Sequence, residues 1–246
     1  MDEKMKHEQF VFRLERGSEK AKLYIYGAIR AEAWDDEKRA FVKSGANALK
    51  DMLDEIPDGN EIELHINSNG GEANQGVTIY NLLRQKAAAG CRINGYVDGA
   101  AYSAAVNVAC AADHLTMGQG TTMLVHNPWS LAMGNAADLR EIADQLDKIG
   151  EASLSLYLSR CGQKISREKL REMMNKETML TAEECVQYGL ADEVAQRQPE
   201  PDPDEAQQKA SLQKTFDAAM EFLLRGREEA ETNDIFDLAK TYLGGK

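Results

Sequence analysis

The feature that most constrains this chain is the alternation of apolar strand-like runs with segments of helical periodicity between residues 23 and 158. Leu23 to Tyr26 forms one run, and Ile62, Leu64 and Ile66 alternate with polar residues as in a half-buried strand. Further strands are predicted over residues 92–97 and 123–125, and helices over 42–56, 73–88, 102–112 and 135–158. Strands that alternate with crossover helices indicate an α/β fold with a largely parallel sheet.

A proline-rich acidic stretch divides the chain. Pro199, Pro201 and Pro203 alternate with acidic residues, a composition typical of an extended hinge. Apolar residues recur at helical spacing after it, which predicts an amphipathic helical tail. We therefore expect a polar N-terminal segment over residues 1–20, a main domain over 21–197, a hinge over 198–210 and a tail over 211–246. The tail is expected either to fold back onto the main domain or a sister subunit, or to serve as a docking arm for a partner.

Charge and composition narrow the class of protein. The formal net charge of -12 at pH 7 argues against nucleic acid as the main partner. No stretch of roughly 18 apolar residues is present, and the N-terminus is charged, so we expect no membrane partner and a cytoplasmic location. The four cysteines have no C-x-x-C pair and no neighbouring histidine, so we expect reduced thiols and no metal site.

Ser103 and His126 are the best candidates for covalent chemistry. Ser103 follows a predicted strand and opens a run of small residues, so it is either an exposed nucleophile or merely a helix cap or small packing residue. A nucleophilic serine needs a base, most often histidine. His7 lies in the polar terminus, His65 within a strand and His114 at a helix exit, whereas His126 ends a strand. His126 is therefore the preferred base, with a plain turn histidine as the alternative.

Two glycines follow the strand that ends at Ile66. Gly70 and Gly71 allow backbone amides to point at a bound oxyanion, although a tight turn that needs positive φ explains them equally well.

In their order along the chain, four motifs resemble the proteolytic subunit of the Clp protease family. The resemblance covers about residues 23–194. The motifs are Asn67-Ser-Asn-Gly-Gly71, Gly99-Ala-Ala-Tyr-Ser103, Leu124-Val-His-Asn-Pro128 and Leu180-Thr-Ala-Glu-Glu-Cys-Val-Gln-Tyr-Gly-Leu-Ala-Asp-Glu-Val194. The last motif also contains a capping box, Thr181-Ala-Glu-Glu184, and a glycine suited to end the helix that it starts.

The resemblance implies a serine endopeptidase with the ββα spiral fold that Clp subunits share with crotonases, followed here by the helical tail. It makes Ser103 the nucleophile and His126 the base, and it implies no cofactor. Glu177 falls where the family has the triad aspartate, with Glu172 and Asp192 as alternatives. A glutamate is one methylene longer, but it is chemically adequate for orienting an imidazole.

The resemblance also implies which backbone amides bind the oxyanion and how the subunits assemble. Backbone amides of Gly70, Gly71 and Ala104 would hold the oxyanion. Substrates would be proteins or peptides, and the chain would form a homo-oligomeric ring, hexameric or heptameric, single or stacked.

The tail, together with glutamate in the acid position, resembles Clp-related proteases of bacteriophages and prophages that are assigned to head maturation. Such an enzyme would cut capsid or scaffold protein inside a prohead, without ATP. General protein degradation in the bacterial cytoplasm with an AAA+ unfoldase partner is the other possibility within the family. A catalytically silent scaffold module and a crotonase-type acyl-CoA enzyme are the alternatives outside proteolysis.

Overall fold

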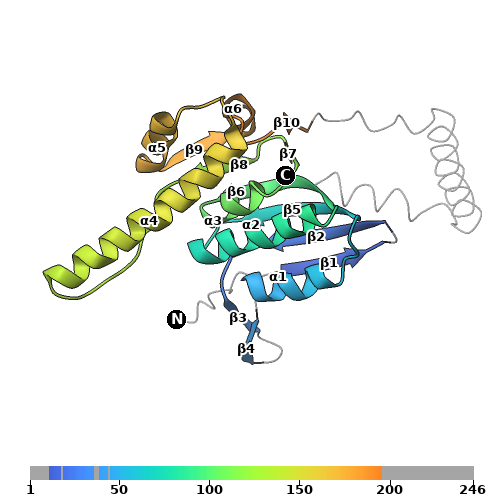
Figure 1. The fold of residues 1–246 in the computed structure, drawn as a ribbon, viewed down its shortest axis with the longest axis horizontal. Helices are drawn as coiled ribbons and strands as arrows, with labels where there is room; N and C mark the ends of the chain where they lie inside the picture. The colour runs from blue at the N-terminus through green and yellow to red at the C-terminus, as the bar shows by residue number, and fades with distance from the viewer. Residues whose placement is uncertain (1–10, 18, 36–38, 44, 196–246) are drawn as a thin grey trace, which may run out of the picture. The chain divides into compact units, whose positions relative to one another are not determined.

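The computed structural model describes residues 11–17, 19–35, 39–43 and 45–195 (Figure 1). The chain divides into two units after Gln196, and the following description concerns the first, Met1–Gln196. The predicted hinge over residues 198–210 and the predicted tail over 211–246 lie outside the described residues, as do residues 1–10.

Strands and helices alternate along most of the described chain (Figure 1). The elements of the first half are β1 (Val11–Arg16), β2 (Lys20–Tyr26), β3 (Glu32–Asp35), β4 (Ala40–Lys43), α1 (Gly45–Asp54), β5 (Glu61–Ser68), α2 (Ala73–Ala88) and β6 (Arg92–Tyr102). Those of the second half are α3 (Ala104–Ala109), β7 (His114–Met117), β8 (Thr122–Val125), α4 (Ala136–Cys161), α5 (Arg167–Asn175), β9 (Thr178–Thr181), α6 (Ala182–Tyr188) and β10 (Glu193–Val194).

The main sheet is largely parallel, as predicted. Its order is β1-β2-β5-β6-β7-β10, with β8 beside β6 and β9 beside β8. Only β1 with β2 and β8 with β9 pair antiparallel in this sheet, within the part of the chain that the structure describes. Strand β6 pairs with two strands on the same side: its residues 94–97 pair with β7 and its residues 100–102 pair with β8. The end of β6 therefore lies next to β8, and β8 leads directly to His126.

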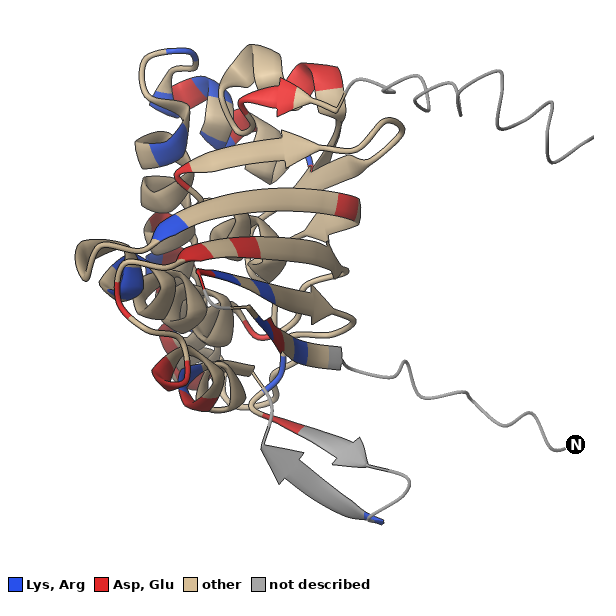
Figure 2. Ribbon diagram, turned by 90° about the vertical axis from the view of Figure 1, so that its right-hand side faces the viewer, with Lys and Arg blue, Asp and Glu red and all other residues tan. Residues whose placement is uncertain are grey.

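Helices α1, α2 and α3 pack along one face of the main sheet (Figure 2). The alternating pattern of β2 and β5 directs Leu23, Ile25, Leu64 and Ile66 into the core, where none of the four is accessible to solvent. Burial of such side chains is the main source of stability for a sheet of this kind. The opposite face carries the polar and aromatic side chains of the same strands.

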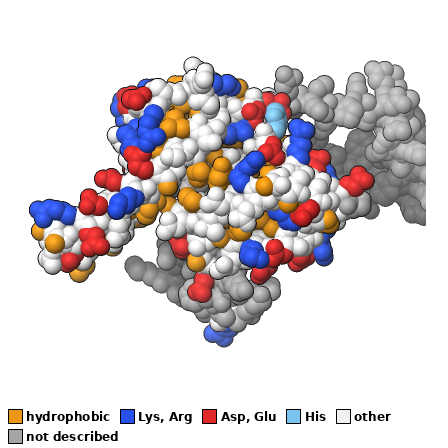
Figure 3. Space-filling view, viewed as in Figure 1, with side chains coloured by type: hydrophobic (Ala, Val, Ile, Leu, Met, Phe, Trp, Pro, Cys, Tyr) orange, Lys and Arg blue, Asp and Glu red, His pale blue; other side chains and the backbone are white. Residues whose placement is uncertain are grey.

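Helix α4 is the longest helix in the described residues, and its first half extends beyond the sheet. The loop before it and its early turns expose apolar side chains amid charged ones (Figure 3). Trp129, Leu131 and Met133 are 78%, 94% and 94% exposed, and Leu139 is 43% exposed. None of the helices in the described ranges combines the length and the apolar character that crossing a bilayer requires.

Several predicted boundaries are confirmed. Helix α2 has the predicted bounds, and α4 begins after Asn135, whose side chain caps it in a capping box with Asp138. Helix α6 starts with the predicted box of Thr181 and Glu184 and ends at Gly189, which adopts the left-handed conformation with φ 81°.

Other predicted boundaries are wrong, each for a local reason. Val42 was expected in a helix, but it lies in β4 and pairs with β3, and α1 starts only at Gly45. The helix expected from Tyr102 starts at Ala104, because β6 continues to Tyr102 while it pairs with β8. Strand β1 precedes residue 21, where the main domain was expected to begin, and pairs with β2 along its whole length.

Candidate active site

Ser103 lies at the junction of β6 and α3 in a backbone conformation that serine rarely adopts. Its φ is 57° and its ψ is -121°. Positive φ costs a residue with a Cβ atom about 1–2 kcal/mol, so the surrounding structure must enforce it. Two backbone bonds do so: the Ser103 amide donates to Leu124 O at 2.9 Å, and Ser103 O accepts from Val106 N at 2.9 Å.

The Ser103 hydroxyl is not used to cap the helix. Ser103 occupies the N-cap position of α3, yet its side chain makes no capping hydrogen bond. The residue is half-buried at the end of a parallel strand, the edge at which α/β proteins place their sites. The capping alternative considered from the sequence is thus not realised.

The turn that contains Gly70 and Gly71 lies directly against Ser103. A Cβ atom on Gly70 would lie 2.8 Å from Ser103 Cβ and 3.0 Å from Ala104 N. Gly71 forms a parallel bridge with Ile29, and a Cβ on Gly71 would lie 2.1 Å from Ile29 O. Both glycines have positive φ, so the turn and the close approach to Ser103 each require glycine.

The three backbone amides proposed for the oxyanion differ in whether they already donate a hydrogen bond. The Gly70 amide donates to Ser68 Oγ at 3.0 Å, so it is already engaged. The amides of Gly71 and Ala104 have no acceptor among the residues that the structure describes. Of the three predicted oxyanion residues, Gly71 and Ala104 therefore have N–H groups without an acceptor, whereas Gly70 does not.

His126 and Glu177 are brought together by the pairing of β8 with β9. Val125 pairs with Thr178 in an antiparallel register, so His126 and Glu177 both adjoin the last pair of the ladder. His126 is half-buried and Glu177 is exposed with φ 51°. Asn127 Nδ2 donates to Asn175 Oδ1 at 2.8 Å, which joins the two segments that follow β8 and precede β9.

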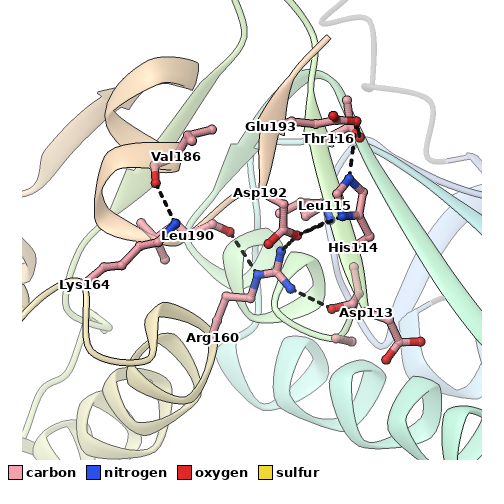
Figure 4. Close-up of polar contacts among 12 residues, drawn as sticks. Asp113, His114, Leu115, Thr116, Arg160, Lys164, Val186, Leu190, Asp192 and Glu193 are labelled. Atoms are coloured by element: carbon pink, nitrogen blue, oxygen red, sulfur yellow. Dashed lines mark hydrogen bonds and ion pairs between the residues drawn. The ribbon is translucent and has the colours of Figure 1, made fainter.

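The alternative acids are engaged elsewhere. Asp192 accepts from the Arg160 guanidinium and from the amide of Leu115, an arrangement that fastens α4 to β7 (Figure 4). Glu172 pairs with Lys169 and Lys176, and these two hydrogen bonds hold its pKa below the usual value. Glu177, which directly precedes β9, is the candidate acid whose side chain has no hydrogen-bond or ion-pair partner in the described residues.

The other described histidines have partners of their own. His65 Nδ1 lies 2.9 Å from Asp98 Oδ2, and His114 Nε2 lies 3.3 Å from Glu193 Oε1. His7 is outside the described residues. His126 is the one histidine of the described ranges whose side chain has no hydrogen-bond or ion-pair partner. Within the same ranges, the side chains of Ser103, His126 and Glu177 are not hydrogen-bonded to one another.

Sequence reasoning missed two residues that shape this site. Ser68 Oγ donates to Gly27 O at 2.6 Å while it accepts from Gly70, so it ties the glycine turn to the end of β2. Its place beside the glycines in the Asn-Ser-Asn-Gly-Gly motif was an available signal. The hydroxyl of Tyr157, buried on α4, donates to Ser103 O at 3.4 Å, and burial raises the pKa of this phenol. Nothing in the sequence around Tyr157 indicated that contact.

Comparison with known proteins identifies relatives by sequence. A family model described as Clp protease matches residues 46–198, more than half of the chain. The ATP-dependent Clp protease proteolytic subunit 2 of Thermobifida fusca is 25% identical over 150 residues, which are 57% of this chain and 68% of that subunit. The subunit of the same name from Chlamydia trachomatis is 31% identical over 140 residues, which are 54% of this chain and 64% of that subunit.

The comparison of structures agrees on the fold. A mutant of ClpP1 from Listeria monocytogenes matches with a TM-score of 0.58 at 20% sequence identity, over 72% of this chain and 92% of that chain. The α/β fold of the Clp subunits, predicted from four short motifs, is thereby confirmed. With the family model matched across more than half of its length, the chain belongs to the Clp protease family.

Proposed function

We propose that this protein is a serine endopeptidase in which Ser103 is the nucleophile, His126 the general base and Glu177 the acid that orients His126. The observation that carries the proposal is the strained, uncapped Ser103 against the Gly70–Gly71 turn. A serine with an uncommitted hydroxyl, fixed beside two amides that lack acceptors, suits acyl transfer.

The proposed reaction proceeds in two steps. Ser103 Oγ attacks the scissile carbonyl while His126 accepts the hydroxyl proton, and His126 then delivers that proton to the leaving amine. Water, deprotonated by His126, hydrolyses the acyl-enzyme and regenerates Ser103. The amides of Gly71 and Ala104 donate hydrogen bonds to the tetrahedral oxyanion in both steps. No cofactor takes part in this scheme.

Alignment of the three side chains is a separate step in this proposal. The backbones of His126 and Glu177 are register neighbours, but their side chains are not bonded in the described residues. Catalytic hydrogen bonds are often loose in a resting state and tighten when substrate binds. In this proposal the side chains of His126 and Glu177 turn toward Ser103 when substrate binds.

We further propose that the substrates are proteins and that the chain acts as a homo-oligomeric ring in the bacterial cytoplasm. The exposed Trp129, Leu131 and Met133 before α4 support assembly, because a lone subunit would leave three large apolar side chains in water. Maturation of phage capsid or scaffold protein within a prohead, without an ATPase, is the physiological role that we favour. General degradation with an AAA+ unfoldase is the alternative role.

Hydrolysis of an unfolded protein and of short peptides by the full chain tests the proposed chemistry. Ser103→Ala and His126→Ala should each lower kcat by about a thousandfold or more. Glu177→Ala should lower kcat by about tenfold or more, because the imidazole loses its orienting partner. Two matched controls should keep the wild-type rate: Thr78→Ala, which removes an exposed hydroxyl on α2, and Glu172→Ala, which removes an exposed acid on α5. Equal rates for wild type and Ser103→Ala would refute the nucleophile.

A further inference from the structure

Three neighbouring strands end together at the candidate site. Strand β2 leads to Ile29, which bridges the glycine turn, while β5 leads into that turn and β6 leads to Ser103. The three strands lie side by side in the main sheet (Figure 1). The distance between the glycine turn and Ser103 therefore depends on how firmly these three strand ends are held together.

A carboxylate joins the three strands a few residues before the site. Tyr26 at the end of β2 donates its hydroxyl to Asp98 Oδ2 at 2.7 Å, and His65 Nδ1 of β5 lies 2.9 Å from the same oxygen. Burial and then the bond to Asp98 raise the pKa of Tyr26 to about 12, so Tyr26 keeps the proton that it donates. Asp98 itself belongs to β6.

Stacking fixes the ring of His65 in the orientation that this bond needs. The ring lies between those of Tyr24 and Tyr96, with centroids 4.9 and 5.1 Å away and planes inclined by 18° and 17°. The Nε2 atom of His65 is buried without a hydrogen-bond partner in the described residues. A proton on Nε2 would have no acceptor there, which favours the tautomer that donates from Nδ1 to Asp98.

The backbone ladder between β5 and β6 is interrupted at this point. Ile66 pairs with Val97 but Ser68 pairs with Ala101, so β6 contains a bulge over residues 98–100. Asn67 Oδ1 accepts from the Ala100 amide at 3.1 Å and thereby closes part of the gap. Asp98 is the first residue of the bulge, and its side chain bonds to His65, which lies just before the point where the regular ladder is lost.

We propose that Asp98, with Tyr26 and His65, is a positioning residue that holds the Gly70–Gly71 turn at its working distance from Ser103. The inference rests on the proposed function of that turn and of Ser103. Loss of the Asp98 carboxylate would let the ends of β5 and β6 separate at the bulge, and the Gly71 and Ala104 amides would no longer converge on one oxyanion. Misplacement of such groups by about 1 Å can cost on the order of a hundredfold in rate.

The variants for the test are made in the full chain. Asp98→Ala removes both bonds, whereas Asp98→Asn keeps an oxygen acceptor in the same place. His65→Phe keeps the stacked ring but removes the Nδ1 donor. Asn94→Ala is the matched control, because Asn94 Nδ2 donates to Glu61 Oε1 at 2.9 Å, a bond between the same two strands but at their other ends.

Amide hydrogen exchange is the first readout, because it does not depend on catalysis. In the structure, the Gly70 and Ser103 amides are bonded to Ser68 Oγ and Leu124 O. Asp98→Ala should speed exchange at these amides by about ten- to hundredfold, and His65→Phe by a smaller factor. Asp98→Asn and Asn94→Ala should stay close to the wild type. Unchanged exchange at both amides in Asp98→Ala overturns the proposal, whether or not the protein hydrolyses peptides.

Steady-state kinetics is the second readout. Asp98→Ala should lower kcat by about ten- to hundredfold with little change in KM, since the oxyanion forms only in the transition state. Asp98→Asn should recover most of that loss, an outcome that a general loss of folding would not give. Equal kcat values for Asp98→Ala and Asn94→Ala would overturn the proposal. If the wild type shows no hydrolysis that depends on Ser103, the proposed function fails, and hydrogen exchange alone decides on Asp98.

Discussion

The backbone around Ser103 is held by two glycines that approach it more closely than residues with a Cβ atom could. A Cβ atom on Gly70 would lie 2.4 Å from Tyr102 O, and one on Gly76 of α2 would lie 2.6 Å from Ala104 O. The two glycines let the turn and α2 approach the junction of β6 and α3 from different sides. The position of the candidate nucleophile is therefore set by backbone contacts, with little help from its own side chain.

Gly70→Ala should inactivate the protein by displacing Ser103. The substituted residue would have a strained φ and would also collide with Tyr102 O and Ser103 Cβ. Gly59→Ala is the matched control, since Gly59 has a similar φ of 86° but no atom within 4 Å of an added Cβ. Gly59→Ala should lower the free energy of unfolding by about 1–2 kcal/mol and leave peptide hydrolysis unchanged. If Gly70→Ala keeps the wild-type kcat, as Gly59→Ala should, the close approach of Gly70 to Ser103 is not required for activity.

Tyr26 should contribute to stability in a way that alkaline pH removes. Its pKa is raised from 10.0 to about 12 in the folded protein, so folding favours the protonated phenol. That contribution is complete below pH 10 and disappears as the pH rises from about 10 to 12. The free energy of unfolding, measured by urea titration across this range, should fall more steeply for the wild type than for Tyr26→Phe. Parallel curves would contradict the raised pKa of Tyr26, which burial and then the bond to Asp98 cause.

The sequence located the candidate site residues along the chain, but it did not indicate the contacts that fix their conformation. Ser103, His126 and the Gly70–Gly71 turn were each predicted at or after the end of a strand, and the structure has each of them there. The positive φ of Ser103 and the engagement of the Gly70 amide by Ser68 depend on contacts between β6, β8 and the end of β2. No local pattern encodes such contacts, so they could not be predicted.

The bounds of elements with strong apolar periodicity or clear helix caps were predicted well. The bounds of elements made of small residues were not. Helix α2 and strand β5 follow their apolar pattern closely. The run from Gly99 to Ala105 has no periodicity, and its alanines favour helix, yet its first part is strand because β8 pairs with it. Short strands such as β7 and β10 were missed, since each is defined by its neighbour in the sheet.

The β8–β9 ribbon has a buried face and an open face. Met123 pairs with Leu180 and both side chains are buried, whereas Leu124 pairs with Met179, which is exposed. Met123→Ala should lower the free energy of unfolding by about 2–5 kcal/mol. Met179→Ala, at a methionine that is 55% exposed, should change it by less than about 0.5 kcal/mol. Equal losses in a urea titration would contradict this register.

At the scale of the whole molecule, the boundary of the folded unit is the feature to test. The predicted hinge begins at residue 198, a few residues after β10. In β10 and just before it, Asp192 bonds to Arg160 and to the Leu115 amide, and Glu193 accepts from Thr116 Oγ1 at 2.9 Å (Figure 4). These contacts fasten the last strand to β7 and to α4, so the unit should remain intact when the chain stops after them.

A chain that ends at residue 197 should unfold in a single cooperative transition. A chain that ends at residue 190 loses Asp192 and Glu193, so it should unfold at a lower urea concentration and with less cooperativity. Circular dichroism during urea titration distinguishes the two cases. If the chain that ends at residue 197 behaves like the shorter one, the boundary of the main domain is wrong.

The central claim, an activated serine at position 103, is tested most directly by labelling with a fluorophosphonate probe. Such probes react with nucleophilic serines, and intact-mass analysis counts the adducts. The wild type and Thr78→Ala should each gain one adduct, and Ser103→Ala should gain none. An adduct on Ser103→Ala, or the absence of an adduct on the wild type, would contradict the assignment of Ser103 as the nucleophile.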